Sequence, residues 1–213
     1  MVSISMRPEE IEQESFRIID AEAEPHGWPD AEWGIIRRVI HTSADFDYAR
    51  TMILSNGVIK AAIASIRGGD GIATDTTMAL SGISKARLLP FGCRVTCHVA
   101  DPDVAEIARQ ASITRSIAAM RKAVAAPANR IFVIGNAPTA LFELMRLIDD
   151  GHVVPSLIIG LPVGFVGAEE SKNSLASIAR GIPYITNTGR KGGSNVAAAV
   201  VNALAIMAAE QPA

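Results

Sequence analysis

Short apolar runs alternate with longer helical stretches from residue 58 onward, and most of the apolar runs close with Gly, Asn, Asp or Thr. This alternation is typical of βαβ units. Two of the runs, at 72–74 and 95–99, also predict strands. The clearest units each pair a strand with the helix that follows it: 131–134 with 139–148, 157–159 with 169–180, and 184–186 with 194–209.

The predicted strands are continuously apolar, which indicates burial on both faces, as in a parallel sheet covered by helices. No linker, low-complexity segment or internal repeat divides the chain, and its 213 residues fit one core. The sequence therefore predicts a single α/β domain over residues 1–213, with a mostly parallel central sheet and helices on both faces. In such sheets the ligand lies at the carboxyl ends of the strands.

The N-terminal part is less regular. Residues 8–20 predict a helix, because acidic residues fill its first turn and apolar positions recur along it. A turn-rich stretch follows at 25–29. Residues 33–41 then indicate an extended or mixed segment that leads into a chain reversal, after which 46–54 predict a helix. This arrangement places His41 at an edge of the fold.

Charge and hydropathy exclude several classes of partner. The formal net charge of −2 gives no support to a nucleic acid or a membrane surface, both of which need a cationic face. The longest apolar stretch, 196–209, is interrupted by Asn202 and is shorter than the roughly 20 residues that span a bilayer. The charged N-terminus does not fit an export signal. Any anionic ligand must find its basic partners locally.

The two cysteines, Cys93 and Cys97, lie four residues apart on a predicted strand, too far for ordinary disulfide geometry. Unpaired cysteines fit a reducing cytoplasm. His98 follows them, but a structural zinc site needs a second cluster of ligands, which the sequence lacks. We therefore expect a cytoplasmic protein with buried, inert cysteines and no metal site.

Gly, hydroxyl residues and amides gather at the predicted strand ends, in HTSADFD, GIATDTTM, GNAPTALFE, GLPVGFVGAEESK and TGRKGGSN. Helix N-termini next to such ends attract anions through free N–H groups. In GNAPTALFE, Asn136 as a cap and Pro138 in the first turn equally describe an ordinary helix start. In TGRKGGSN, Arg190 and Lys191 sit among three glycines before a helix capped by Ser194 or Asn195, which a solvated turn would not need.

Motifs for several enzyme classes are absent from the sequence. Neither G-x-G-x-x-G after a strand nor G-x-x-x-x-G-K-[ST] occurs, so nucleotide binding loses support. G-x-S-x-G and H-E-x-x-H are also missing, which leaves serine hydrolases and zinc proteases without support. His41 is followed by Thr42, Ser43 and Asp45, which can orient an imidazole. On these residues alone, a catalytic and a structural role for His41 remain equally open.

Seven segments between about residues 11 and 204 lie in the order of a known family: IEQESFRII, RRVIHTSADFDYA, GGDGIATDTTM, SITRSIAAM, VIGNAPTALFEL, IGLPVGFVGAEESK and ITNTGRKGGSNVAAAVVNAL. Together they resemble the precorrin-8X methylmutase family of cobalamin biosynthesis. The resemblance implies an isomerase that shifts a methyl group on ring C of precorrin-8X, giving hydrogenobyrinic acid by a 1,5-sigmatropic migration. It also implies an α/β fold, a homodimer and no cofactor.

The resemblance places the family's catalytic histidine at His41. An imidazole, with an unperturbed pKa of about 6.5, retains an acid fraction near neutral pH and can protonate or hydrogen-bond a ring nitrogen. The acetate and propionate arms of the substrate call for cations and hydrogen-bond donors. The candidate substrate-binding residues are Ser15, Arg17, Thr42, Thr74, Arg115, Gly135, Asn136, Gly164, Arg190 and Lys191. For Arg17 and Thr74, an exposed helix face and a strand end are equally good explanations.

Two alternatives remain open. A transferase or dehydrogenase using the same sheet edge would need a nucleotide or methyl-donor loop, which the sequence lacks. A non-catalytic tetrapyrrole carrier would bind the macrocycle without needing His41. So wide a ligand predicts a cleft at a dimer edge. The sequence does not separate cobalt-free from cobalt-containing substrates.

Overall fold

The computed structural model describes residues 7–23, 25–177 and 181–210. Within them a six-stranded sheet has the order β1-β6-β5-β4-β2-β3. All neighbouring strands are parallel except β1, which runs antiparallel to β6 at one edge. The strands are β1 (Met52–Leu54), β2 (Gly71–Thr74), β3 (Val95–Cys97), β4 (Asn129–Ile134), β5 (Leu157–Gly160) and β6 (Tyr184–Asn187). The predicted mostly parallel α/β sheet is confirmed.

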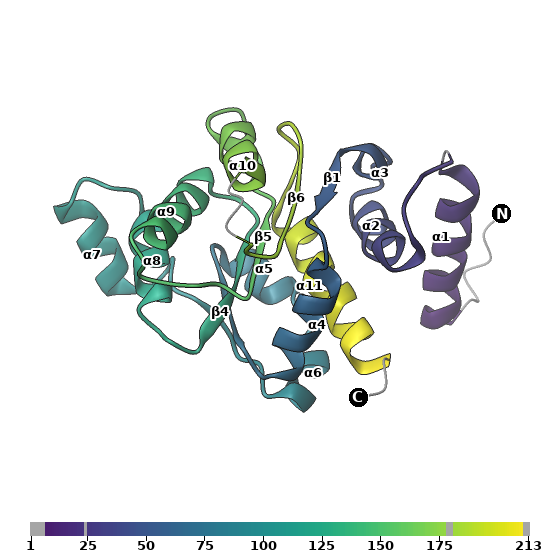
Figure 1. The fold of residues 1–213 in the computed structure, drawn as a ribbon, viewed down its shortest axis with the longest axis horizontal. Coiled ribbons are helices and arrows are strands. Elements are labelled where there is room, and N and C mark those ends of the chain that lie inside the picture. Colours follow the sequence, from purple (N-terminus) through teal and green to yellow (C-terminus); the bar gives the residue numbers. More distant parts are fainter. Residues whose placement is uncertain (1–6, 24, 178–180, 211–213) are drawn as a thin grey trace.

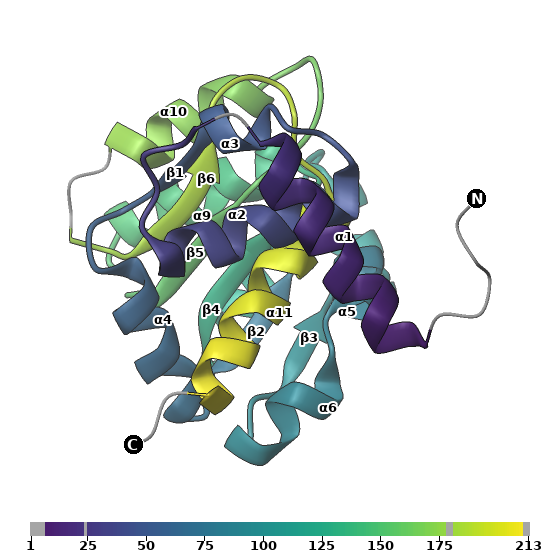
Figure 2. The same cartoon turned by 90° about the vertical axis from the view of Figure 1, so that its right-hand side faces the viewer.

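Helices cover both faces of this sheet, because alternate side chains of each strand point to opposite sides. On β4, Ile131 and Val133 join a core with α2, α4 and α11, whereas Phe132 and Ile134 join a second core with α8 and α9. Figure 1 shows the two helix layers, and Figure 2 shows α11 and α2 lying over the first face with α1 outside α2.

The first layer consists of α1 (Pro8–Glu22), α2 (Asp30–Ser43), α4 (Val58–Arg67), α5 (Thr77–Gly82), α6 (Lys85–Leu88) and α11 (Ser194–Glu210). The second consists of α7 (Pro102–Gln110), α8 (Arg115–Val124), α9 (Pro138–Asp149) and α10 (Ala168–Ser177). Two short helices, α3 (Tyr48–Thr51) and the 3-10 helix η1 (Leu89–Phe91), lie between longer elements.

The prediction of an extended or mixed segment at 33–41 is wrong, because this stretch lies inside α2. Trp33, Ile36 and Ile40 are buried at helical spacing, and α2 packs against α11. The neighbouring β-branched residues obscured that spacing, since they are also common in strands. Ala44 ends the helix in the left-handed region, with φ of 52°. His41 therefore lies in the last turn of a helix.

The helix predicted over 46–54 is also wrong for most of its length. Only α3 is helical there, and the chain then enters β1. β1 extends the sheet beyond β6, with Ile53 opposite Thr186. This short strand draws the segment after His41 against the loop that follows β6.

A buried carboxylate, Asp75, joins the carboxyl ends of β2 and β4. It is 2% exposed and accepts hydrogen bonds from the N–H groups of Gly135, Asn136 and Ala137, at 2.9, 2.9 and 2.7 Å. Asn136 is therefore not the cap of α9. Burial raises the pKa of the Asp75 carboxyl, while the three N–H donors act in the opposite direction. The positive end of α9 is neutralised from within the protein.

No helix in the described part of the chain is long and apolar enough to cross a membrane. Both cysteines are free thiols; Cys93 is buried as predicted, whereas Cys97 is only half-buried.

Replacing Asp75 with Ala should lower the free energy of unfolding by about 2–4 kcal/mol, because three N–H groups lose their acceptor in a buried place. Chemical denaturation followed by circular dichroism measures this. Asp103→Ala, which removes an exposed carboxylate of α7, is the matched control and should change stability far less. Equal effects of the two changes would contradict the bridging role of Asp75.

Candidate active site

His41 is exposed in the last turn of α2. The partial negative charge at this helix end interacts favourably with an imidazolium. Its ring meets Phe16 of α1 edge-on, with 5.3 Å between ring centroids and 62° between planes. A cavity of about 220 Å³ opens beside it, lined by Ser15, Ile18, Ile19, Glu22, Ile40, His41, Ala44 and Phe46.

Phe16 is held in place by two arginines that the sequence analysis did not select. The guanidinium groups of Arg37 and Arg38 lie 4.5 and 5.1 Å from the Phe16 ring centroid. Arg37 also pairs with Asp20 at 2.7 Å, and Arg38 pairs with Glu12 at 3.0 Å on the same helix. These contacts fix α1 against α2. The spacing of four and three residues before His41 would have indicated a shared helix face, had α2 been predicted.

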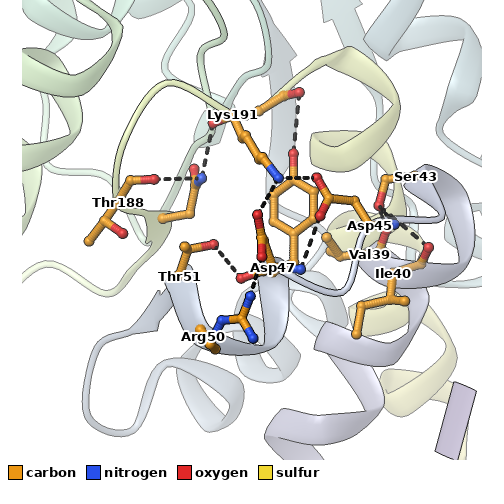
Figure 3. Close-up of polar contacts among 12 residues, drawn as sticks. Val39, Ile40, Ser43, Asp45, Asp47, Arg50, Thr51, Thr188 and Lys191 are labelled. Carbon is orange, nitrogen blue, oxygen red and sulfur yellow. Dashed lines mark hydrogen bonds and ion pairs between the residues drawn. The ribbon is translucent and has the colours of Figure 1, made fainter. Parts of the chain in front are cut away.

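The segment after His41 is clamped to the loop after β6. Lys191 Nζ lies 2.6 Å from Asp45 Oδ2 and 2.6 Å from Asp47 Oδ2 (Figure 3). Asp47 also pairs with Arg50. The two carboxylates raise the pKa of Lys191, and hydrogen bonding to Lys191 lowers that of Asp47. We call this set, Asp45, Lys191 and Asp47, the lysine clamp.

Two further contacts place the same loop beside the end of α2. Asn195 Nδ2 donates to the Thr42 carbonyl at 3.3 Å. The Tyr48 hydroxyl donates to the Gly192 carbonyl at 3.5 Å. Burial raises the pKa of Tyr48 to about 12, so this phenol stays protonated near neutral pH.

A chain of contacts continues along the carboxyl edge of the sheet. The Gly164 N–H donates to the Arg190 carbonyl at 3.2 Å. Gly192 packs so tightly that a Cβ there would lie 2.3 Å from the Leu161 carbonyl oxygen. Farther along, Thr114 Oγ1 meets Thr139 Oγ1 at 3.2 Å, joining the starts of α8 and α9. We call this row of loops and helix ends the carboxyl-edge surface. In space it runs from His41 through Lys191, Arg190 and Gly164 to Arg115.

The exposed cations on this surface differ in how they are partnered. Arg115 begins α8, and Arg190 lies over Phe165 at 5.7 Å from the ring centroid. Within the described residues, neither guanidinium pairs with a carboxylate. Lys191, by contrast, is engaged by the lysine clamp. The positive charge available to an anionic ligand is therefore that of the two arginines.

Other predicted residues lie less favourably for ligand binding. The Thr74 hydroxyl is buried and directed at the carbonyls of Thr76 and Thr96, at 3.1 and 3.2 Å. Arg17 pairs with Glu14 and does not line the cavity beside His41. The N–H groups of Gly135 and Asn136 are engaged by Asp75.

Ser15, Thr42 and Gly164 belong to the carboxyl-edge surface or its immediate border. Ser15 lines the cavity beside His41 and donates its own proton to the Ile11 carbonyl at 2.8 Å. Thr42 is exposed, and a Cβ on Gly164 would meet open space. Among the described residues, no group of three or more His, Cys, Asp or Glu side chains is arranged to hold a metal ion.

Comparison with known proteins gives a consistent result. The family model described as precorrin-8X methylmutase matches residues 10–207. The cobalt-precorrin-8 methylmutase of Priestia megaterium is 45% identical, covering 96% of this chain and 90% of the relative. The precorrin-8X methylmutase of Pseudomonas aeruginosa is 42% identical, covering 92% and 93%.

A solved structure agrees with these sequence matches. The precorrin-8X methyl mutase from Thermus thermophilus superimposes with a TM-score of 0.86 at 40% identity, covering 95% of this chain and 97% of that one. A family model over almost the whole chain, close relatives and a shared fold point the same way. The chain belongs to the precorrin-8X methylmutase family.

Proposed function

We propose that His41 is the proton donor in the isomerisation of the precorrin-8X methylmutase family, the conversion of precorrin-8X to hydrogenobyrinic acid in cobalamin biosynthesis. One observation carries the proposal. The His41 imidazole is exposed, held edge-on by Phe16, and opens onto a cavity at one end of the carboxyl-edge surface.

The chemistry requires a proton and a fixed geometry. A methyl group migrates between neighbouring carbons of ring C within one molecule. The reaction therefore consumes no methyl donor and no electron carrier. Protonating or strongly hydrogen-bonding a ring nitrogen polarises the conjugated system and lowers the barrier to migration. General acid catalysis of this kind contributes about 100- to 10,000-fold. Holding the macrocycle in the reactive conformation supplies the rest.

The carboxyl-edge surface offers complementary contacts for such a ligand. Arg190 and Arg115 are suited to the acetate and propionate arms because guanidinium groups bind carboxylates in bidentate fashion. Phe165 and Val166, 84% and 89% exposed, provide apolar contacts for the flat ring. Ser15 and Thr42 contribute further polar groups beside His41. The main chain at Gly164 permits close approach.

The size of the ligand supports a homodimer. The cavity beside His41, about 220 Å³, is smaller than the roughly 300–1,000 Å³ of pockets for drug-sized ligands, and a corrin macrocycle is larger than those ligands. One chain thus receives an edge of the ring, and a second subunit closes the site at the dimer edge. The free thiols are consistent with a cytoplasmic enzyme.

Changing His41 to Ala should reduce turnover about 100- to 10,000-fold while retaining ligand binding. Visible absorption after mixing with precorrin-8X or its cobalt-containing counterpart measures turnover, since substrate and product differ in conjugation. His152→Ala, an exposed histidine after α9, is the matched control and should behave as wild type. A tetrapyrrole carrier would bind the macrocycle with an unchanging spectrum in all three proteins, which would refute the catalytic role.

Replacing Arg190 or Arg115 with Ala should raise KM about 10-fold or more and weaken its dependence on ionic strength, because each guanidinium pairs with a carboxylate arm. Steady-state kinetics at low and high salt measures both effects. Arg109→Ala, on α7 and paired with Glu106, provides the control. If Arg109→Ala raised KM as much as the other two changes, the assignment of these two arginines would be wrong.

Light scattering should give a mass of about 45 kDa, twice the 22.5 kDa of one chain. Specific activity should then fall on dilution below the dissociation constant of the dimer. A fully active monomer would contradict a site closed by the second subunit.

A further inference from the structure

Lys172 lies on α10, and its side chain is buried, with 1% exposure. Its ammonium reaches the loop after β6, where it donates to the Lys191 carbonyl at 2.6 Å and to Asn187 Oδ1 at 3.1 Å. Both acceptors are neutral, and no carboxylate within the described residues forms an ion pair with it. Lysine is almost never fully buried without such a partner. A buried ammonium without a carboxylate partner is not explained by a gain in folding stability, which indicates another role for Lys172.

Asn187 reinforces the same point of attachment. It is 1% exposed, and its Nδ2 donates to the carbonyls of Lys191 and Thr188, at 3.0 Å each. The Lys191 carbonyl thus accepts from two buried donors. This fixes the turn formed by residues 188–191.

The side chain of Lys191 extends the attachment to the segment after His41. Its ammonium forms the lysine clamp with Asp45 and Asp47. Lys191 is therefore bound at two points, because its main-chain carbonyl accepts from Lys172 and its side chain pairs with the two aspartates. Arg190 precedes it in the same turn. A displacement of this turn would therefore move both the segment after His41 and Arg190, which we propose binds a carboxylate arm of the substrate.

We propose that Lys172 is a positioning residue for the methyl shift: from beneath the carboxyl-edge surface, its ammonium holds the 188–191 turn so that the lysine clamp and Arg190 keep their places relative to His41. The inference rests on the proposed function of that surface. Lys172 does not touch the substrate and acts through Lys191.

The charge state of Lys172 matters because charge-assisted hydrogen bonds are roughly twice as strong as neutral ones. Burial lowers the pKa of Lys172 to about 8, opposed by Glu169 on the same helix. The elements packed against α10 are β6 and α9. The titratable groups on these two elements and on the adjoining 188–191 turn are Tyr184, Glu143, Arg146, Asp149, Arg190 and Lys191.

Deprotonation of Lys172 should have opposite effects on the stability of the fold and on the position of the 188–191 turn. A lysine whose folded-state pKa is lowered binds fewer protons in the folded state than in the unfolded one between about pH 8 and 10.5. Stability therefore rises with pH through this window, whereas the hold on the turn weakens. Removing the ammonium should cost turnover without costing stability.

The test compares Lys172→Met with Lys60→Met, an exposed lysine of α4. For Lys172→Met we expect an unfolding midpoint equal to or above that of wild type, kcat about 10- to 100-fold lower, and a much smaller change in KM. Lys60→Met should match wild type in all three. A kcat of Lys172→Met within twofold of wild type, or a lowered unfolding midpoint that accounts for the lost activity, would overturn the proposal.

The pH profile supplies an independent readout. Wild-type kcat should fall with an apparent pKa near 8, a step that Lys172→Met lacks. If Lys172→Met does not fold, the wild-type profile decides, and a profile without this step overturns the proposal. Failure of the proposed function is distinguishable, because wild type itself would then leave the precorrin spectrum unchanged.

Lys191→Met breaks the lysine clamp from the other side. Because Lys172 positions the lysine clamp through the Lys191 main chain, the loss of kcat in the double variant should be smaller than the product of the two single losses. Losses that multiply would show that the two lysines act independently and would refute the route through Lys191.

Discussion

The lysine clamp is the interaction on which the arrangement at the carboxyl edge depends. It joins the segment after His41 to the loop after β6, two parts of the chain about 145 residues apart in sequence. Exposed ion pairs of this kind contribute little to overall stability. Their importance here is geometric, because the clamp links the segment after His41 to the turn that carries Arg190. Lys172 and Asn187 fix the main chain from which the clamp extends.

The sheet explains why these groups meet at all. Parallel strands bring their carboxyl ends to one edge, and helices begin or end there with unsatisfied main-chain groups. At β4 the protein satisfies these groups itself, with the carboxylate of Asp75. An anionic ligand is therefore not drawn to the start of α9. On the carboxyl-edge surface, the exposed guanidinium groups of Arg115 and Arg190 form no ion pair within the described residues.

The sequence predicted the regular βαβ part of the fold because continuously apolar strands and amphipathic helices carry strong periodic signals. It failed around His41, where α2 contains β-branched residues and β1 has only three residues. The lysine clamp and the Asp75 bridge could not have been predicted, because each joins residues distant in sequence. For Lys172, nothing in GAEESK indicates that this lysine is buried and not on the solvated face of α10. The resemblance identified the family, but it did not show which cations are already paired.

A crystal structure of this chain with hydrogenobyrinic acid bound would test the role of His41 most directly. We expect an imidazole nitrogen of His41 about 2.6–3.2 Å from a nitrogen of the macrocycle, or joined to it through one water. The carboxylate arms should contact Arg190 and Arg115, with the lysine clamp intact. A macrocycle bound with its ring nitrogens beyond the reach of His41 would rule out His41 as the proton donor.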